Sequence, residues 1–386
     1  MKFQIYMPTK IYFGSGELKQ LGNIELPGKK ALIVISSGNS MRKNGYLERV
    51  ISLLNKQGAE SAVFDKIQSN PVLDTVMEGA AFAKEHSCDF VIGLGGGSSI
   101  DAAKSIAIMA TNEGNYWDYM LSGSGGKKQV ENKPLSIIAI PTTAGTGTEA
   151  DPWTVITKPD THEKIGFGIE DTFPCVSIVD PELMTSVPPY VTAYTGIDAF
   201  SHAVEAYLAN IAQPISDMLA LEAVKYISAN LATAINKPHD IKAREKLAWA
   251  STAAGLCETY SCCIGNHSIE HALSAYNDKL PHGVGLAIIG PAFFEYIIDS
   301  NPTRFYNLAI AMNPHSQSHY DFVKEFKRLI FEANLAGETL SKYGFVKEQL
   351  FDIAQNTIDT MGFLFDFMEV KLNLGDIYNI LMKAYK

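Results

Sequence analysis

The first half of the sequence alternates short apolar runs with segments of helical periodicity, and this alternation constrains the fold more than any other feature. Alternating strands and helices are typical of βαβ units, which place parallel strands in a sheet covered by helices. We therefore predict strands at 30–36, 60–65, 89–97, 135–141 and 175–180, with helices near 45–57, 72–86 and 99–110 between them.

The composition of the chain changes at Pro188 and Pro189. From there onward the sequence consists of long segments rich in Ala, Leu, Glu and Lys, with few β-branched runs. A chain of 386 residues is long enough for two domains with separate cores. The expected organisation is an α/β domain over residues 1–187, followed by an all-α domain over residues 188–386.

Charge and composition exclude several classes of partner. The formal net charge is −10, which disfavours nucleic acid and anionic membrane surfaces because both require a basic face. We find neither an apolar run of 18 residues nor the apolar region of a signal peptide, so we expect no membrane partner and a cytoplasmic protein. Five cysteines without CxxC spacing favour reduced thiols.

Two segments of the second half carry candidate metal ligands. Asp198 and His202 are four residues apart, as are His267 and His271, so each pair lies on one face of a helix. His282 lies between a proline and a glycine, which predicts a turn. A site formed by Asp198, His202, His267 and His282 suits Fe(II) or Zn(II) and leaves a coordination position for a substrate oxygen.

The alternative interpretation of these histidines is structural. In a chain with nine histidines a single pair at a spacing of four residues is often a coincidence. Two such pairs, one with an aspartate and one followed by Pro-His-Gly, are less easily accidental. The remaining histidines lie in polar surroundings, and we expect them to be solvated: His86, His162, His239, His315 and His319.

Two glycine-containing turns follow strands of the first half. Gly95-Gly96-Gly97-Ser98-Ser99 begins a helix that carries Asp101, and residues 141–149 read PTTAGTGTE. Backbone N–H groups at such a helix start can hold a pyrophosphate, and two such loops at carboxyl ends of strands form a dinucleotide crevice. A tight structural connection is the alternative for the first turn.

The turn after the strand at 30–36 bears on the choice of nucleotide. NAD-preferring sites usually place a carboxylate there, whereas this chain has small hydroxyl residues followed by Arg42 and Lys43. These side chains can donate to a 2′-phosphate, which favours NADP(H) over NAD(H). The alternative is a solvated basic turn.

Four long motifs resemble signatures of the iron-dependent (group III) alcohol dehydrogenase family, in the order in which that family has them. They are GGGSSIDAAK at 95–104, PTTAGTGTEA at 141–150, GIDAFSHAVEAY at 196–207 and HSIEHALSAYNDKLPHGVGLAI at 267–288. The similarity extends over essentially the whole chain. The turn at Ser37, Gly38 and Ser40 is similar to that of the NADPH-preferring, butanol-dehydrogenase-like members.

The resemblance implies a dehydroquinate-synthase-like fold, a homodimer and a set of site residues. The metal ligands would be the four residues above, and His271 would belong to a proton relay beside the nicotinamide and the substrate. Matching cofactor-contact positions would be Asn70, Gly96, Gly97, Ser98, Asp101, Thr142, Thr143, Thr146 and Lys164. The segment ETYSCCIGN at 258–266 differs from the segments typical of the family, so the substrate is left open.

The function expected from these features is hydride transfer between NAD(P)H and a small primary alcohol or aldehyde at a metal centre. We expect Phe167, Cys262 and Tyr276 to give the substrate pocket an apolar lining. One alternative is a dehydroquinate-synthase-type lyase, which is disfavoured because Lys279 is the only basic residue near the candidate ligands. The other is a non-catalytic metal-binding module.

Overall fold

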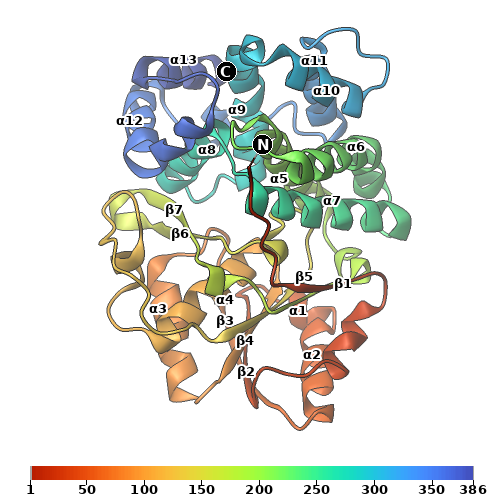
Figure 1. Ribbon diagram of the computed structural model, residues 1–386, viewed down its shortest axis with the longest axis vertical. Helices are drawn as coiled ribbons and strands as arrows, with labels where there is room; N and C mark the ends of the chain where they lie inside the picture. The colour runs from red at the N-terminus through yellow and green to blue at the C-terminus, as the bar shows by residue number, and fades with distance from the viewer. Residues whose placement is uncertain (1, 386) are drawn as a thin grey trace.

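A parallel sheet of six strands forms the centre of the N-terminal half in the computed structural model, which describes residues 2–385 (Figure 1). The strand order is β1-β8-β5-β4-β2-β3, and every pairing is parallel. The predicted alternation is confirmed. The strands are β1 Lys10–Phe13, β2 Lys30–Ser36, β3 Glu60–Ile67, β4 Phe90–Gly95, β5 Ser136–Pro141 and β8 Val176–Val179.

Helices cover both faces of this sheet: α1 Ser40–Lys43, α2 Tyr46–Lys56, α3 Leu73–Glu85 and α4 Gly97–Thr111. Alternate residues of β2 enter different cores, because side chains of a strand point to opposite faces. Leu32 and Val34 pack with residues of α3 and α4, whereas Ile33 and Ile35 pack with residues of α2. Burial on both faces explains why the strands read as continuous apolar runs.

Three strands were not predicted from the sequence. β1 is a short edge strand, and β6 Thr154–Lys158 pairs with β7 Glu163–Phe167 in an antiparallel hairpin outside the main sheet. The hairpin sequence contains charged residues and Pro159, which hide its strand character. The hairpin matters because β7 packs against helix α8 and carries Lys164 toward the other half of the molecule.

The C-terminal half is helical, as expected. The last strand of the sheet ends at Val179 and α5 begins at Pro189, on either side of the predicted boundary. One large core joins these helices. They are α5 Pro189–Leu208, α6 Pro214–Asn236, α7 Ile241–Tyr260, α8 Gly265–Tyr276, α9 His282–Ile297, α10 Pro302–Met312, α11 Asp321–Glu332, α12 Leu350–Met361 and α13 Leu374–Ala384.

Two helical stretches, α6 and residues 282–300 beginning with α9, are long and apolar enough to cross a membrane by length and composition. Both contribute residues to the helical core, among them Val224 from α6 and Phe293 from α9. Core helices of folded domains pass the same test. Packing against neighbouring helices accounts for the apolar character of the second stretch, whose apolar window is 67% buried, and for the inward-facing residues of α6, whose window is 39% buried.

Candidate functional site

A cavity of about 690 Å³ lies between the two halves of the molecule. Its walls include the glycine turn after β4, the threonine-rich loop after β5, and residues of α5, α8 and α9. Ligand sites commonly occupy clefts of this size, at the carboxyl ends of parallel strands and between domains. The cavity therefore joins the predicted nucleotide loops to the predicted metal ligands.

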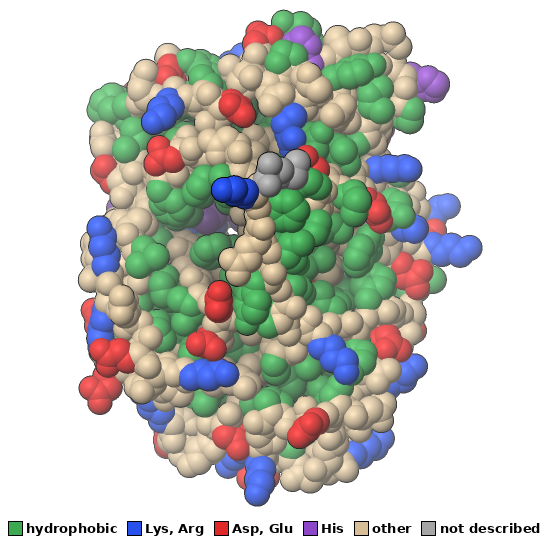
Figure 2. Space-filling model, viewed as in Figure 1, with side chains coloured by type: hydrophobic (Ala, Val, Ile, Leu, Met, Phe, Trp, Pro, Cys, Tyr) green, Lys and Arg blue, Asp and Glu red, His purple; other side chains and the backbone are tan. Residues whose placement is uncertain are grey.

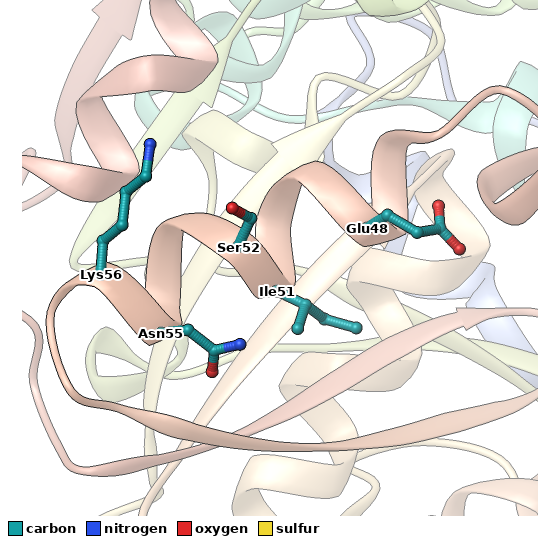
Figure 3. Close-up of a pocket in the computed structure, with 5 residues that line it drawn as sticks. All are labelled: Glu48, Ile51, Ser52, Asn55 and Lys56. Atoms are coloured by element: carbon teal, nitrogen blue, oxygen red, sulfur yellow. The ribbon is translucent and has the colours of Figure 1, made fainter.

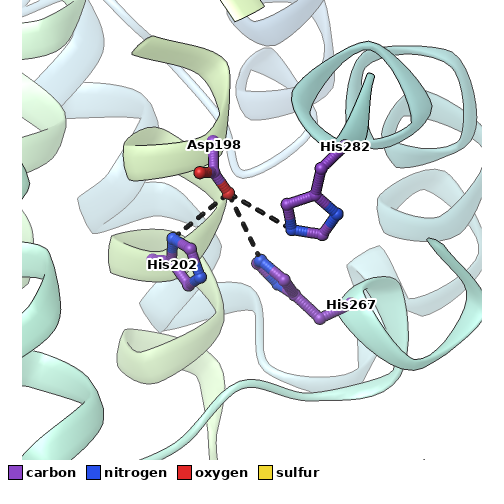
Figure 4. Close-up of side chains that lie close together, drawn as sticks. All are labelled: Asp198, His202, His267 and His282. Carbon is purple, nitrogen blue, oxygen red and sulfur yellow. Dashed lines mark ion pairs between the residues drawn. The ribbon is translucent and has the colours of Figure 1, made fainter. Parts of the chain in front are cut away.

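The four predicted metal ligands converge at one end of this cavity (Figure 4). One ligand atom from each lies within 4.8 Å of the others. Asp198 Oδ1 is 3.4 Å from His202 Nδ1, 3.8 Å from His267 Nε2 and 3.4 Å from His282 Nε2. The prediction of a turn at His282 was wrong, because Pro281 is the N-cap and His282 is the first residue of α9.

Each of the three imidazoles contacts a glutamate through its other ring nitrogen. His267 Nδ1 is 2.6 Å from Glu205 Oε1, and His202 Nε2 is 2.9 Å from Glu258 Oε1. His282 Nδ1 is paired with Glu270 in the same way. A carboxylate that accepts one ring N–H fixes the imidazole tautomer and leaves the second nitrogen free for a metal.

These glutamates were not singled out from the sequence. A signal was present, because Glu205 lies three residues after His202 and Glu270 lies three residues after His267, spacings that share a helix face. In the structure each of these glutamates contacts a histidine of a different helix. Glu205 of α5 contacts His267 of α8, and Glu270 of α8 contacts His282 of α9. Such a pairing depends on how the helices pack and cannot be read from spacing.

The donor set fits a divalent cation. Asp198 Oδ1, His202 Nδ1 and His267 Nε2 are buried and lack hydrogen-bond partners among the described residues. Buried polar atoms are normally paired, so three unpaired atoms aimed at one point indicate a missing partner. One carboxylate oxygen and imidazole nitrogens are ligands that suit iron or zinc.

The ionisation of the cluster agrees with this interpretation. Burial lowers the pKa of His202 to about 3, so this imidazole is neutral and has a free lone pair. Burial also tends to lower the pKa of His267, but the carboxylates of Glu205 and Asp198 outweigh this effect and raise the pKa to about 9. A bound cation would displace the proton from His267, because an imidazole nitrogen must be deprotonated to coordinate a metal.

His271 lies beside the metal ligands and lines the cavity. Its side chain is buried, and its Nδ1 has no hydrogen-bond partner among the described residues. Burial, with Lys164 and His282 nearby, holds the pKa of His271 well below its usual value. The imidazole is therefore neutral, and the predicted part in a proton relay remains a prediction.

The two nucleotide loops are packed directly against each other. A Cβ atom at Gly97 would lie 2.5 Å from Thr146 Cγ2, and one at Gly96 would lie 3.1 Å from Thr143 Oγ1. Gly95 adopts φ +151°, which side chains rarely allow. Glycine is required here because the threonine loop approaches the start of α4, where free backbone N–H groups can meet a phosphate.

Most of the other residues predicted to contact the cofactor also line the cavity. They are Ser40, Asn70, Gly96, Gly97, Ser98, Asp101, Thr142, Thr143, Thr146 and Lys164. Ser37 and Gly38 are exposed and are not among the lining residues, although Ser36 beside them is. Their predicted contact with the cofactor is thus not supported by their position.

Three charged residues form hydrogen bonds or ion pairs that the sequence did not indicate. The Asp101 carboxylate accepts hydrogen bonds from Thr148 Oγ1 at 2.7 Å and from the backbone N–H of Val155 at 3.0 Å. Lys104, which is fully buried, donates to Thr148 Oγ1 at 2.6 Å. Lys164 Nζ lies 3.4 Å from Glu270 Oε2, so it joins β7 to the outer carboxylate of His282.

The prediction that Phe167, Cys262 and Tyr276 line the substrate pocket was wrong. Phe167 packs in the core beside the sheet, Cys262 packs against the helical core, and Tyr276 stacks on His162. None of the three is among the cavity-lining residues. The apolar contribution comes instead from Trp153, Val155, Val191 and Tyr194.

A second hollow lies on the outer surface beside α2 (Figure 3). It is open to solvent, has a volume of about 470 Å³, and is lined by Glu48, Ile51, Ser52, Asn55 and Lys56. In Figure 3 these side chains point in different directions along the helix, without converging on one point. We assign no function to this hollow.

Comparison with protein families gives two matches that together span nearly the whole chain. Residues 8–181 match the family described as iron-containing alcohol dehydrogenase. Residues 192–385 match the C-terminal domain of the Fe-containing alcohol dehydrogenase family. These ranges correspond to the α/β half and the helical half of the structure.

Individual proteins show the same similarity. The chain is 34% identical to NADH-dependent butanol dehydrogenase B of Clostridium acetobutylicum, over 93% of this chain and 94% of that protein. It is 32% identical to NADPH-dependent butanol dehydrogenase of Clostridium saccharobutylicum, over 92% and 89%. The crystal structure of an archaeal halo-thermophilic alcohol dehydrogenase from a Red Sea brine pool superposes with a TM-score of 0.95, at 35% identity, covering 100% of this chain and 99% of that one. The dehydroquinate-synthase-like fold is thereby confirmed.

The outer carboxylates generate a testable prediction. Glu205→Gln should weaken metal binding by about 10- to 100-fold, because the amide orients His267 less strongly and makes it less basic. Competition with a chromophoric chelator would measure the metal affinity. Glu222→Gln, at an exposed glutamate that accepts a hydrogen bond from Trp249, is the matched control and should bind metal as the unaltered protein does. Equal affinities for Glu205→Gln and the control would contradict the assignment.

Proposed function

Since this chain belongs to the iron-containing alcohol dehydrogenase family, we propose that its metal-dependent, NAD(P)-linked alcohol dehydrogenase activity interconverts short primary alcohols and aldehydes, with NADP(H) preferred. The observation that carries the proposal is the convergence of Asp198 and three imidazoles at one end of the cavity that also contains the glycine turn. Two of the similar proteins are dehydrogenases of butanol, a short primary alcohol.

The metal site supplies the first part of the chemistry. Asp198, His202, His267 and His282 would hold a divalent iron, which when bound contributes Lewis acidity toward an alcohol or carbonyl oxygen. Glu205, Glu258 and Glu270 keep the three imidazoles in the tautomers that this requires. Lys164 balances the charge of Glu270 from the opposite half of the molecule.

The remaining residues bind the nucleotide and handle the proton. The free N–H groups at the start of α4 suit a pyrophosphate, and Thr142, Thr143 and Thr146 offer hydroxyls along the same wall. His271 is neutral and lines the cavity close to the metal ligands. Its imidazole can relay a proton from the substrate side, with one ring nitrogen accepting a proton as the other gives one up. Binding both reactants in one cavity supplies their orientation.

The two alternatives receive less support. A dehydroquinate-synthase-type lyase needs several free basic groups for a phosphorylated, carboxylated substrate. Among the described residues that line the cavity, the basic side chains are Lys164 and Lys279, and Lys164 is already paired with Glu270. A non-catalytic metal-binding module gives no reason for a nucleotide crevice beside the metal ligands.

The proposed preference for NADP(H) is based on the residues at the end of the cavity away from the metal ligands. The residues of 36–69 that line it are neutral, among them Ser36, Ser40 and Asn44, so no carboxylate on this wall opposes a 2′-phosphate. Arg42 forms an exposed ion pair with Asp65, at 2.7 Å. Exposed pairs of this kind contribute little stability, and Arg42 can therefore turn toward a phosphate. The two butanol dehydrogenases differ in cofactor, so they do not decide this point.

We also propose a homodimer formed through the N-terminal segment. β1 lies at the edge of the sheet with one side unpaired, and hydrophobic residues of the segment that precedes it are exposed: Phe3 at 49%, Ile5 at 49% and Tyr6 at 45%. Figure 2 shows hydrophobic side chains gathered on the face that carries this end of the chain. An unpaired strand edge with apolar neighbours is a surface that a second copy can cover.

The activity is tested by the oxidation of NADPH with butanal on protein loaded with Fe(II). Asp198→Asn should lower turnover by more than about 100-fold, since it removes the only carboxylate among the four ligands. NADPH binding should survive, because the glycine turn is unchanged. Asp359→Asn, at an exposed aspartate of α12, is the control. Undiminished turnover in Asp198→Asn, or in protein stripped of metal, would refute the proposal.

Cofactor preference is tested by Ser36→Asp. The added carboxylate should lower the ratio of kcat/KM for NADPH to that for NADH by at least about tenfold, because it repels the 2′-phosphate. Ser52→Asp, at an exposed serine of α2 outside the cavity, should leave this ratio unchanged. The proposed preference fails if the unaltered enzyme favours NADH or if both variants behave alike.

Light scattering after gel filtration tests the dimer. The unaltered protein should have twice the mass of one chain, and Ile5→Lys should shift it toward the monomer by placing a charge in the contact. Phe331→Lys, at a residue of α11 that is 71% exposed, is the matched control. A monomeric wild-type protein, or a dimer unaffected by Ile5→Lys, would rule out this interface.

A further inference from the structure

Helix α7 contacts the threonine-rich nucleotide loop at several successive points, although α7 itself carries none of the predicted ligands. The backbone N–H of Gly145 donates to Ser251 Oγ at 2.8 Å, and Thr252 Oγ1 donates to Glu149 Oε1 at 2.6 Å. Two turns farther along, Thr259 Oγ1 donates to the carbonyl of Ala150 at 3.1 Å. Three hydrogen bonds therefore join this loop of the α/β half to a helix of the other half.

Two glycines allow this contact to be as close as it is. A Cβ atom at Gly255 would lie 2.1 Å from the carbonyl oxygen of Gly147, and one at Gly147 would lie 2.5 Å from the backbone nitrogen of Gly255. Gly147 also adopts φ +69°, which favours glycine. The backbone of the loop therefore contacts the backbone of α7 directly, and no side-chain rotation on either segment could make room for an added methyl group.

The same stretch of α7 reaches the metal ligands. Glu258, three residues after Gly255, contacts His202 Nε2 at 2.9 Å. On the loop side, a Cβ atom at Gly145 would lie 3.3 Å from Asp198 Oδ2. Residues 251–258 thus touch both the loop that lines the nucleotide cavity and a residue that orients a metal ligand.

We propose that residues 251–258 of α7 are a positioning element that sets the separation between the nicotinamide and the metal centre, with Gly255 as the residue on which the separation depends. The inference rests on the proposed function, because it assumes that a nucleotide occupies the loop side of the cavity. None of these residues needs to touch the substrate. Their effect is to hold Thr142, Thr143 and Thr146 at a fixed place relative to Asp198 and His202.

Glu149 strengthens the attachment. Its carboxylate is buried, with 2% exposure, and burial raises its pKa. The hydroxyl of Thr252 is its hydrogen-bond donor from α7. A buried acidic group with one partner from the opposite half makes separation of the loop from α7 unfavourable, because the partner would be lost without water to replace it.

Gly255→Ala tests the inference directly. The added methyl must push the loop and α7 apart by about 1 Å to restore van der Waals contact. A displacement of that size should lower kcat by about 10- to 100-fold. The primary isotope effect with NADPH deuterated at C4 should rise, because hydride transfer becomes rate-limiting. The dissociation constant for NADPH should rise severalfold, while metal content stays at the wild-type value.

Gly290→Ala is the matched control, since it adds the same methyl to a helical glycine of α9 that faces Phe326 in the helical core. It should change neither kcat nor the isotope effect, even if it changes thermal stability. Should Gly255→Ala fail to fold, Thr252→Val removes only the bond to Glu149 and should shift kcat and the isotope effect in the same direction by a smaller amount.

The inference is overturned if Gly255→Ala, or Thr252→Val in its place, keeps the wild-type kcat and isotope effect. It is also overturned if Gly290→Ala alters them equally. A wild-type protein without any NADPH-linked turnover would instead contradict the proposed function. In that case NADPH binding decides the matter, since an unchanged dissociation constant in Gly255→Ala would still exclude a positioning role.

Discussion

The arrangement of the whole cleft depends on one electrostatic constraint, the burial of Asp198 among three imidazoles. Removing so many polar and ionisable groups from water is unfavourable unless each has a partner. The outward-facing nitrogens have theirs in Glu205, Glu258 and Glu270. The inward-facing atoms have none within residues 2–385 apart from one another, so the protein builds a place for a cation.

This constraint links the two halves of the molecule. The ligands come from α5, α8 and α9 of the helical half, but the groups around them come from both sides of the cavity. Lys164 reaches Glu270 from the β6–β7 hairpin, and Gly145 brings the nucleotide loop beside Asp198. A nucleotide held along that loop and an oxygen at the metal would therefore meet in one cavity, as hydride transfer requires.

The sequence predicted the parts of this structure that depend on periodicity and local motifs. The buried strands, the helical half and the convergence of four ligands all follow from patterns within single segments or from motif order. It did not predict the β6–β7 hairpin, whose strands are polar, nor the start of α9 at His282. Phe167 and Tyr276 were misplaced because facing depends on how elements pack.

The features that escaped prediction share a physical cause. Glu205 contacts a histidine 62 residues away, Lys104 is buried by a loop more than 40 residues later, and Gly255 meets Gly147 across the interface. Each is a long-range pairing between groups whose local sequence gives no sign of the partner. Residues of this kind orient and space the ligands, whereas the ligands themselves stand in recognisable motifs.

X-ray absorption spectroscopy of the iron-loaded protein tests the central claim most directly. Cys263 lies within 4.8 Å of possible ligand atoms of both His202 and Glu258, so a sulfur ligand is a real competitor. The account predicts a shell of nitrogen and oxygen atoms alone, with the outer scattering of three imidazoles. A sulfur atom in the first shell, or fewer than three imidazoles, would contradict it.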